Sequence, residues 1–237
     1  MTVRAVVFDW GGTLTPWHDI DLVSQWYAYA EVYDPENASP LAHRLAEAEI
    51  HRWRIQRESH GAESAGALDQ LFLDEGIDIT QARHLRALGN YLDFWSPHTC
   101  ADPQARTVLA GLRESGCRIG VLSNTMWPSA HHREVFQRDD LDDLIDSAFY
   151  TSEMSVAKPH AESFTAVLDS LGVTAQESVF VGDRLWDDIA GAARVGMRTV
   201  LIPHSRVPED EMPDTTVRPD ATAHELLDVL HIVRSWQ

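Results

Sequence analysis

The sequence predicts an α/β fold in which a mainly parallel sheet is interrupted by a helical insertion, and three observations support this. Short apolar runs bounded by turn residues alternate with helical patterns from residue 98 to the C-terminus. One more apolar run lies close to the N-terminus. Residues 16–97, between these two parts, carry helical patterns without a strand pattern. Strands separated by helices imply βαβ units with right-handed crossovers, and therefore a mainly parallel sheet.

The N-terminal apolar run, residues 6–8, is typical of a short buried strand and is followed by Asp9. In open α/β sheets, ligands bind beyond the carboxyl ends of the strands, so Asp9 is a candidate functional residue. Gly11 and Gly12 come soon after it and let a ligand approach the backbone closely. An ordinary turn after a strand explains this stretch equally well when it is taken alone.

The insertion is predicted to consist of helices. Their approximate ranges are 21–32, 41–60, 65–75 and 81–95, with turn-forming residues between and after them. Successive helices without strands favour a small bundle. We therefore predict two domains: an α/β core formed by residues 1–15 and 98–237, and a helical domain formed by residues 16–97.

The rest of the chain alternates regularly between the two kinds of pattern. Helices are expected at 102–115, 128–137, 159–171, 186–195 and 223–234, and strands at 118–122, 148–151, 178–181 and 199–202. The acidic run at 139–143 is interpreted as a solvated helix face in preference to a metal site. Residues 203–221 are rich in proline and acidic residues and are expected to form a surface loop.

Composition argues against several classes of function. The formal net charge is −18, which disfavours nucleic acid and anionic membranes as partners because both require clustered cations. The chain has no signal-peptide pattern and no apolar run long enough to span a bilayer, so a cytoplasmic protein is expected. Cys100 and Cys117 are too few for a disulfide framework, and Lys158 is the only lysine. The oligomeric state is left undetermined.

Polar residues gather where the ligand edge of the predicted sheet should lie. They end strands, follow strands or precede a helix, and they are Asp9, Ser123, Lys158, Asp183, Asp187 and Asp188. A carboxylate, a hydroxyl, a cation and an acidic cluster at one edge suit phosphoryl transfer, where catalysis is mainly positioning and charge neutralisation. The carboxylates would bind a hard cation through oxygen, and Mg²⁺ is the usual one beside a phosphate.

At these positions the sequence resembles the haloacid dehalogenase superfamily, across essentially the whole α/β part. The family's first motif, Asp-x-Asp-Gly-Thr, is similar to DWGGT at 9–13, and its second, an apolar strand ending in Ser or Thr, is similar to GVLSN at 120–124. The third-motif lysine matches Lys158, and the fourth motif, Gly-Asp followed by a second acid, matches GDRLWDD at 182–188. The insertion falls where many members carry a cap domain, so the resemblance implies a Rossmann-like core with an inserted helical cap.

The resemblance implies roles for individual residues. Asp9 would be a nucleophile that forms an aspartyl phosphate, which water then hydrolyses. Ser123 and Lys158 would hold the phosphoryl oxygens, and Gly12, Thr13 and Asn124 would contact the substrate. Mg²⁺ is expected between Asp9, the Gly11 carbonyl and Asp183, with Asp187 or Asp188 reaching it directly or through water. The expected activity is that of a Mg²⁺-dependent phosphatase acting on a small phosphorylated metabolite.

Position 11 departs from the family pattern. The family's phosphatases have an aspartate there that protonates the leaving group and later activates water, whereas this chain has Gly11. General acid–base catalysis contributes roughly 10²–10⁴-fold, so a phosphatase with this motif needs another proton donor or a good leaving group. His18 is a candidate donor, and a group on the second helix of the insertion is a further candidate to face the substrate: His51, Arg52, Arg54 and Arg57. The alternative for the arginines is a solvated helix face.

Three other interpretations stay open. Phosphonoacetaldehyde hydrolases also lack the second aspartate, and their first motif, Asp-Trp-Ala-Gly-Thr, is similar, but they need a cap lysine for a Schiff base and residues 16–97 contain none. A haloacid dehalogenase would use Asp9 to displace halide from carbon, but that branch loses the metal-binding aspartate that Asp183 matches here. The third is a non-catalytic binding protein on a degenerate site, which the retention of Asp9, Lys158 and Asp183 disfavours.

Overall fold

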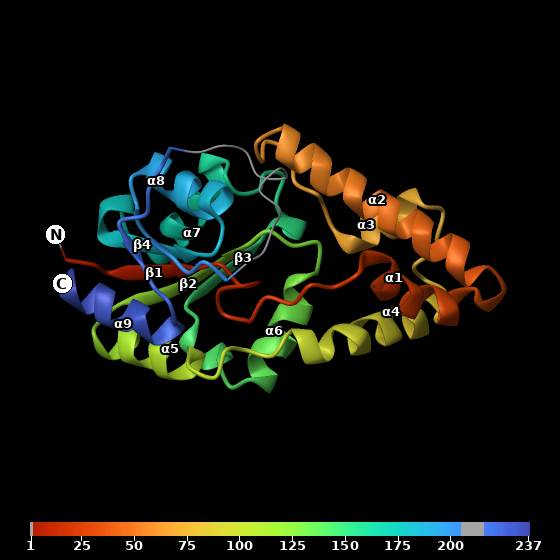
Figure 1. Ribbon diagram of the computed structural model, residues 1–237, viewed down its shortest axis with the longest axis horizontal. Helices are drawn as coiled ribbons and strands as arrows, with labels where there is room; N and C mark the ends of the chain where they lie inside the picture. The colour runs from red at the N-terminus through yellow and green to blue at the C-terminus, as the bar shows by residue number, and fades with distance from the viewer. Residues whose placement is uncertain (1, 205–215) are drawn as a thin grey trace.

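The computed structural model describes residues 2–204 and 216–237, and these residues form a six-stranded sheet with helices on both faces (Figure 1). The strand order is β3-β2-β1-β4-β5-β6, and every neighbouring pair is parallel. The strands are β1 Ala5–Phe8, β2 Arg118–Ser123, β3 Ser147–Tyr150, β4 Ser178–Gly182, β5 Arg198–Leu201 and β6 Ala221–Thr222. The predicted α/β fold class is confirmed.

Strand β6 begins at Ala221, the last residue of the stretch that was expected to be a surface loop. Its residues Ala221 and Thr222 pair with Val200 and Leu201 of β5. A two-residue strand is too short to produce a hydrophobic pattern, so the sequence gives no signal for it. Residues 205–215 of the same expected loop lie outside the described residues.

Helices occupy the predicted segments with small shifts at their ends. Those between β1 and β2 are α1 Leu22–Tyr33, α2 Ala38–Glu58, α3 Leu68–Asp74 and α4 Ala82–Trp95. The others are α5 Ala105–Glu114, α6 Ser129–Arg138, α7 Ala161–Leu171, α8 Gly191–Val195 and α9 Leu226–Ser235. A π-helical segment, η6 Leu185–Ala190, leads into α8. Over the described parts of the chain, no helix is long and apolar enough to cross a membrane.

Asp140, Asp142 and Asp143 of the acidic run 139–143 are exposed as expected, whereas Asp139 is partly buried and Leu141 is buried, and the run is not a helix face. Helix α6 ends at Arg138, and the run follows it as a turn and a short 3₁₀ segment that begins at Asp142. The Asp143 carboxylate lies 3.1 Å from the Arg106 guanidinium, and both side chains are more than half exposed. The prediction of a helix was wrong here because acidic residues favour a solvated surface without specifying which backbone carries them.

The central strands β1 and β4 are buried on both faces of the sheet, which explains why they are almost entirely apolar. Val6 and Phe8 of β1 lie fully buried in one cluster with residues of α5 and α9. Ala5 and Val7 point to the opposite face, as strand alternation requires, and pack in a second cluster with residues of α7. Figure 1 shows α5 and α9 on one side of the sheet, and α7 and α8 on the other.

Helices α1 to α4 extend beyond one end of the sheet (Figure 1). Helix α1 packs against both α2 and α4. A row of aromatic rings joins this part to the sheet: Trp26 of α1 stacks with Tyr91 of α4 at 5.0 Å between ring centroids, Tyr91 meets Trp127 at 6.5 Å, and Trp127 meets Trp10 at 5.9 Å. The helices therefore share one apolar cluster with a face of the sheet, and the domain boundaries near residues 15 and 98 stay a prediction.

Candidate functional site

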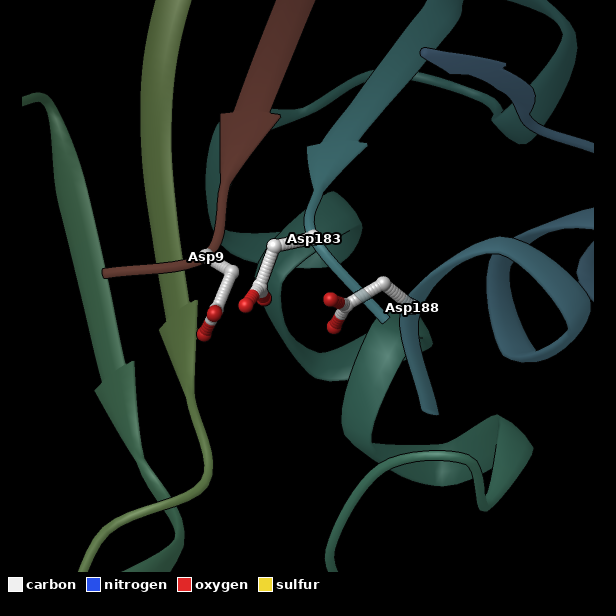
Figure 2. Close-up of side chains that lie close together, drawn as sticks. All are labelled: Asp9, Asp183 and Asp188. Atoms are coloured by element: carbon white, nitrogen blue, oxygen red, sulfur yellow. The ribbon is translucent and has the colours of Figure 1, made fainter. Parts of the chain in front are cut away.

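Three acidic residues meet beyond the carboxyl ends of β1 and β4. Phe8 of β1 pairs with Val181 of β4, and the Asp9 N–H donates to the Val181 carbonyl at 2.9 Å, so Asp9 continues the ladder by one residue. Asp183 directly follows β4, and Asp188 belongs to η6. Figure 2 shows their three carboxylates gathered at this edge. The parallel register thus brings together residues that are far apart in the sequence.

The three carboxylates form a compact buried cluster. Each offers one oxygen atom, and these atoms lie within 4.8 Å of one another, with no residue of the three more than 6% exposed. The Lys158 ammonium lies among them and donates to Asp9 Oδ1 and Asp188 Oδ1, at 2.7 Å each. Several carboxylate oxygens at this spacing are the donor set that a hard divalent cation prefers. The residues present therefore fit a metal ion.

Burial and charge act in opposite directions on these groups. Burial raises the pKa of Asp9, and the neighbouring Lys158 lowers it by less. Burial lowers the pKa of Lys158, but the carboxylates of Asp188 and Asp9 outweigh it, so the pKa of Lys158 rises. Lys158 is consequently a fixed positive charge. It offsets part of the cost of placing two carboxylates beside each other away from water.

Of the two acids that end the fourth motif, Asp188 joins the cluster and Asp187 turns toward Arg184. The Asp187 carboxylate lies 3.7 Å from the Arg184 guanidinium, and burial raises the pKa of Asp187 to about 6. Asp188 is held in place by Lys158 and by the Arg184 backbone N–H, which donates to its second oxygen at 2.9 Å. The π-helical turn of η6 points the adjacent side chains of Asp187 and Asp188 in different directions. Such turns are frequent at functional sites.

The glycines of the site differ in the space around them. Gly12 has φ +80°, and a Cβ atom there would lie 2.3 Å from Asp183 Oδ2. A Cβ atom on Gly182 would lie 2.4 Å from the Asp188 carboxylate. At Gly11, by contrast, a Cβ atom would meet nothing within 4 Å. Glycine is therefore sterically required at positions 12 and 182 but not at position 11.

The remaining predicted site residues line the same edge. Ser123 is buried at the end of β2. Thr13 has a buried hydroxyl to which no described residue offers a hydrogen bond. Asn124 holds the Lys158 backbone on both sides, because its amide donates to the Lys158 carbonyl and accepts from the Lys158 N–H, each at 3.0 Å. The Asn124 side chain thus fixes the segment that carries the lysine.

A cavity of about 730 Å³ lies beside the carboxylate cluster, between the helices and the sheet edge. Arg184 and Asp187 line it from the side of the cluster, and Trp17 lines it from the segment after β1. Helix α2 contributes one face to the wall, including Trp53. Sequence analysis did not single out Arg184, Trp17 or Trp53, and only Arg184 carried a local signal, its position directly after Asp183.

The residues proposed as a replacement proton donor or as substrate contacts differ in whether they line this cavity. His18 and Arg57 are among its lining residues. Arg52 instead pairs with Asp74 and donates to a backbone carbonyl, and Arg54 contacts His51 on the exposed side of α2. The structure therefore brings His18 and Arg57 toward the site and leaves the other three on surfaces away from the cavity wall.

Comparison with known proteins identifies related sequences along most of the chain. A family model described as haloacid dehalogenase-like hydrolase matches residues 3–196. A glyceraldehyde 3-phosphate phosphatase of Pyrococcus abyssi is 37% identical over 108 residues, which cover 44% of this chain and 43% of the relative. A glyceraldehyde 3-phosphate phosphatase of Methanopyrus kandleri is 28% identical over 237 residues, covering 96% of this chain and 97% of the relative.

Solved structures share the fold. A HAD phosphatase from Thermococcus onnurineus superimposes with a TM-score of 0.68 at 22% identity, covering 98% of each chain. An L-2-haloacid dehalogenase from Xanthobacter autotrophicus gives a TM-score of 0.62 at 21% identity over the whole of both chains. Since one fold carries both reactions in these proteins, it does not distinguish between them, and the side chains of the site must do so.

Proposed function

This chain belongs to the haloacid dehalogenase-like hydrolases, and from that premise we propose that it is a Mg²⁺-dependent phosphatase of small phosphorylated molecules. The observation that carries the proposal is the buried cluster of Asp9, Lys158, Asp183 and Asp188. Relatives along the whole chain support it, because the Methanopyrus kandleri protein is a phosphatase. We also propose that residues 16–97 act as a cap over a core formed by residues 1–15 and 98–237.

In the proposed reaction Asp9 attacks phosphorus. One Asp9 oxygen forms the bond, the ester oxygen leaves with its electron pair, and water then hydrolyses the aspartyl phosphate. Lys158, held by Asp9 and Asp188, keeps the nucleophile oriented and offers positive charge to the phosphoryl oxygens. The buried hydroxyls of Ser123 and Thr13 are suited to bind the same oxygens.

The proposed Mg²⁺ ligands are Asp9, Asp183, Asp188 and the Gly11 carbonyl. When bound, the ion neutralises charge on the phosphoryl group. Gly12 supports the metal site indirectly, because any side chain at position 12 would collide with the Asp183 carboxylate. Asn124 likewise positions Lys158 through the backbone. Each motif residue is thus assigned a catalytic, metal-binding or positioning role that is consistent with its contacts.

The alternative reactions are supported less well. Phosphonoacetaldehyde hydrolysis requires a Schiff-base lysine, but the chain's only lysine is Lys158, and its ammonium is bonded to Asp9 and Asp188. Halide displacement from carbon needs no cation, so it leaves the clustering of Asp183 and Asp188 around Asp9 without a purpose. The absence of an acid at position 11 bears on the choice of substrate and leaves the reaction class unchanged.

The test of the proposed function is inorganic phosphate release from phosphoesters and acetyl phosphate, with and without Mg²⁺. We expect Mg²⁺-dependent release, and a loss on the order of 10⁴-fold or more in Asp9→Asn, because removal of a nucleophile abolishes the covalent route. Asp143→Asn changes an exposed acid that pairs with Arg106 and is not part of the cluster, so it serves as the control and keeps full activity. Turnover retained by a folded Asp9→Asn protein would exclude Asp9 as the nucleophile.

A further inference from the structure

The cavity beside the carboxylate cluster is placed to receive the part of a substrate that leaves. Arg184 and Asp187, which line it, neighbour Asp183 and Asp188 in the sequence. Trp17 also borders the phosphate loop, since a Cβ atom on Gly12 would lie 3.5 Å from its ring. A phosphoryl group bound at Asp9 would therefore lie next to this cavity.

Among the described residues that line the cavity, Trp17 and Trp53 have indole N–H groups that are already bonded. The Trp17 Nε1–H donates to Asp19 Oδ1 at 2.9 Å, and the Trp53 Nε1–H donates to Glu49 Oε1 at 3.1 Å. The two rings thus have only their carbon surfaces left to offer a ligand. Ile20, Leu22, Ile50 and Trp95 add further apolar surface to the same wall.

Charge in the cavity does not favour a second anionic group. Asp19, Asp21 and Asp187 line it, and Arg184 is shared between Asp187 and the Trp17 ring, whose centroid lies 5.5 Å from the guanidinium carbon. The lining thus has two arginines, Arg57 and Arg184, against three carboxylates. A substrate with a carboxylate or a second phosphate in the cavity would meet more negative than positive charge.

The size of the cavity also disfavours a short polar substrate. A volume of about 730 Å³ lies within the range of roughly 300–1,000 Å³ that holds drug-sized ligands. A three-carbon phosphate would leave the indole rings in contact with water. A flat apolar group would cover them, and aromatic rings gain from stacked or edge contacts as well as from burial.

We infer that the substrate is an aryl phosphate, with its aromatic ring packed on Trp17 and Trp53. The inference rests on the proposed function and names its substrate class. It also accounts for the lack of a leaving-group acid at position 11. When Asp9 forms its bond to phosphorus, the bond from phosphorus to the ring oxygen breaks, and that oxygen leaves as a phenolate stable enough to depart without a proton donor. Water then releases phosphate from Asp9, and the phenolate takes a proton from solvent.

The first measurement compares wild-type kcat/KM for 2-naphthyl phosphate, phenyl phosphate, acetyl phosphate and glyceraldehyde 3-phosphate. The two aryl esters leave with similar ease but differ in ring area, so a difference between them reports contact with the cavity. We expect 2-naphthyl phosphate to exceed phenyl phosphate by about tenfold, mainly through KM. Equal values, or a preference for glyceraldehyde 3-phosphate, would overturn the inference and leave the phosphatase assignment intact. Release from none of the four would overturn both.

The second measurement uses Trp53→Leu, with Trp236→Leu as its matched control. Trp236 lies near the C-terminus under Arg198, outside the set of residues that line the cavity. We expect Trp53→Leu to lower kcat/KM for 2-naphthyl phosphate by about tenfold and to leave acetyl phosphate within about twofold, and Trp236→Leu to change neither. An equal loss on both substrates would assign Trp53 a structural part and overturn the inference. Trp53→Phe, which keeps a ring, should restore most of the preference.

Discussion

The carboxylate cluster and the tryptophan-lined cavity beside it are built in opposite ways. In the cluster, Lys158 and the acids around it are buried charges that compensate one another. In the cavity wall, Trp17 and Trp53 have their N–H groups bonded to acids and present carbon. The cluster is therefore sensitive to any displaced or unpaired charge, whereas the wall is sensitive to lost surface. Changes in the first should affect every substrate, and changes in the second should alter the ratio between substrates.

The largest effect expected from a small change in the cluster comes from Gly12→Ala, with Gly11→Ala as its neighbour control. An alanine at position 12 would have to adopt φ +80° and would place its Cβ atom 2.3 Å from Asp183 Oδ2, so Asp183 must move. Displacement of a catalytic group by about 1 Å can cost about 10²-fold, and we expect a loss of kcat of that order with acetyl phosphate and with aryl phosphates alike.

Gly11→Ala should change kcat by no more than about twofold, because its Cβ atom enters open space. Thermal unfolding of both variants separates loss of function from loss of fold. If the two substitutions reduce kcat equally while both proteins stay folded, Gly12 does not act through Asp183, and the distinction between the two glycines fails.

An intermediate effect is expected from Gly11→Asp. This substitution adds a general acid to the cluster, which an aryl substrate bound in the cavity is inferred not to need. The open space at position 11 can accept the side chain. We expect kcat for alkyl phosphates to rise on the order of tenfold, below the roughly 10²–10⁴-fold of an evolved general acid, and kcat for aryl phosphates to change little. Measured kcat across a series of leaving groups checks this. An equal rise for all of them would mean that proton donation does not limit the wild-type enzyme, and that the new carboxylate acts in another way.

The difference between the carboxylate cluster and the cavity wall also explains what could be predicted from the sequence. Asp9 and Asp183 follow short apolar runs, and parallel strands place their ends at one edge, so local patterns were enough to bring them together. The two-residue strand β6 gave no pattern, and the π-helical turn that directs Asp188 into the cluster and Asp187 toward Arg184 cannot be read from spacing. Neither could the pairing of the Asn124 amide with the Lys158 backbone.

The cavity wall was not predicted, for a different reason. Trp17 follows the first motif and Trp53 lies in the middle of α2, and nothing local marks either one as part of a site. A tryptophan at helical spacing indicates a core position, and its contact with a cavity depends on how α2 packs over the sheet edge. Four residues of α2 were considered as substrate contacts: His51, Arg52, Arg54 and Arg57. Of these described residues only Arg57 lines the cavity, and helix spacing does not distinguish it from the others.

The smallest expected effect concerns Glu49, which connects a buried charge to the cavity wall. Its Oε2 atom accepts from Gln25 at 2.7 Å and from Trp26 at 2.8 Å, and its Oε1 atom accepts from Trp53 at 3.1 Å. In Glu49→Gln the remaining carbonyl oxygen can keep the first two bonds, while the amide faces the Trp53 N–H and cannot accept from it. The substitution therefore releases Trp53 and leaves its ring in the protein.

We expect Glu49→Gln to lower kcat/KM for 2-naphthyl phosphate by about threefold, the value of one ordinary hydrogen bond, and to leave acetyl phosphate unchanged. Stability adds a second readout with a definite sign. Burial raises the pKa of Glu49 above 4.5, so the folded protein holds this proton more tightly than the unfolded chain, and the wild type loses stability as pH rises through that range. The variant cannot ionise here, so its free energy of unfolding relative to wild type should improve as pH rises above 4.5 in urea titrations. A constant difference across that range would mean that Glu49 ionises as easily in the fold as outside it, and that Trp53 is held by packing alone.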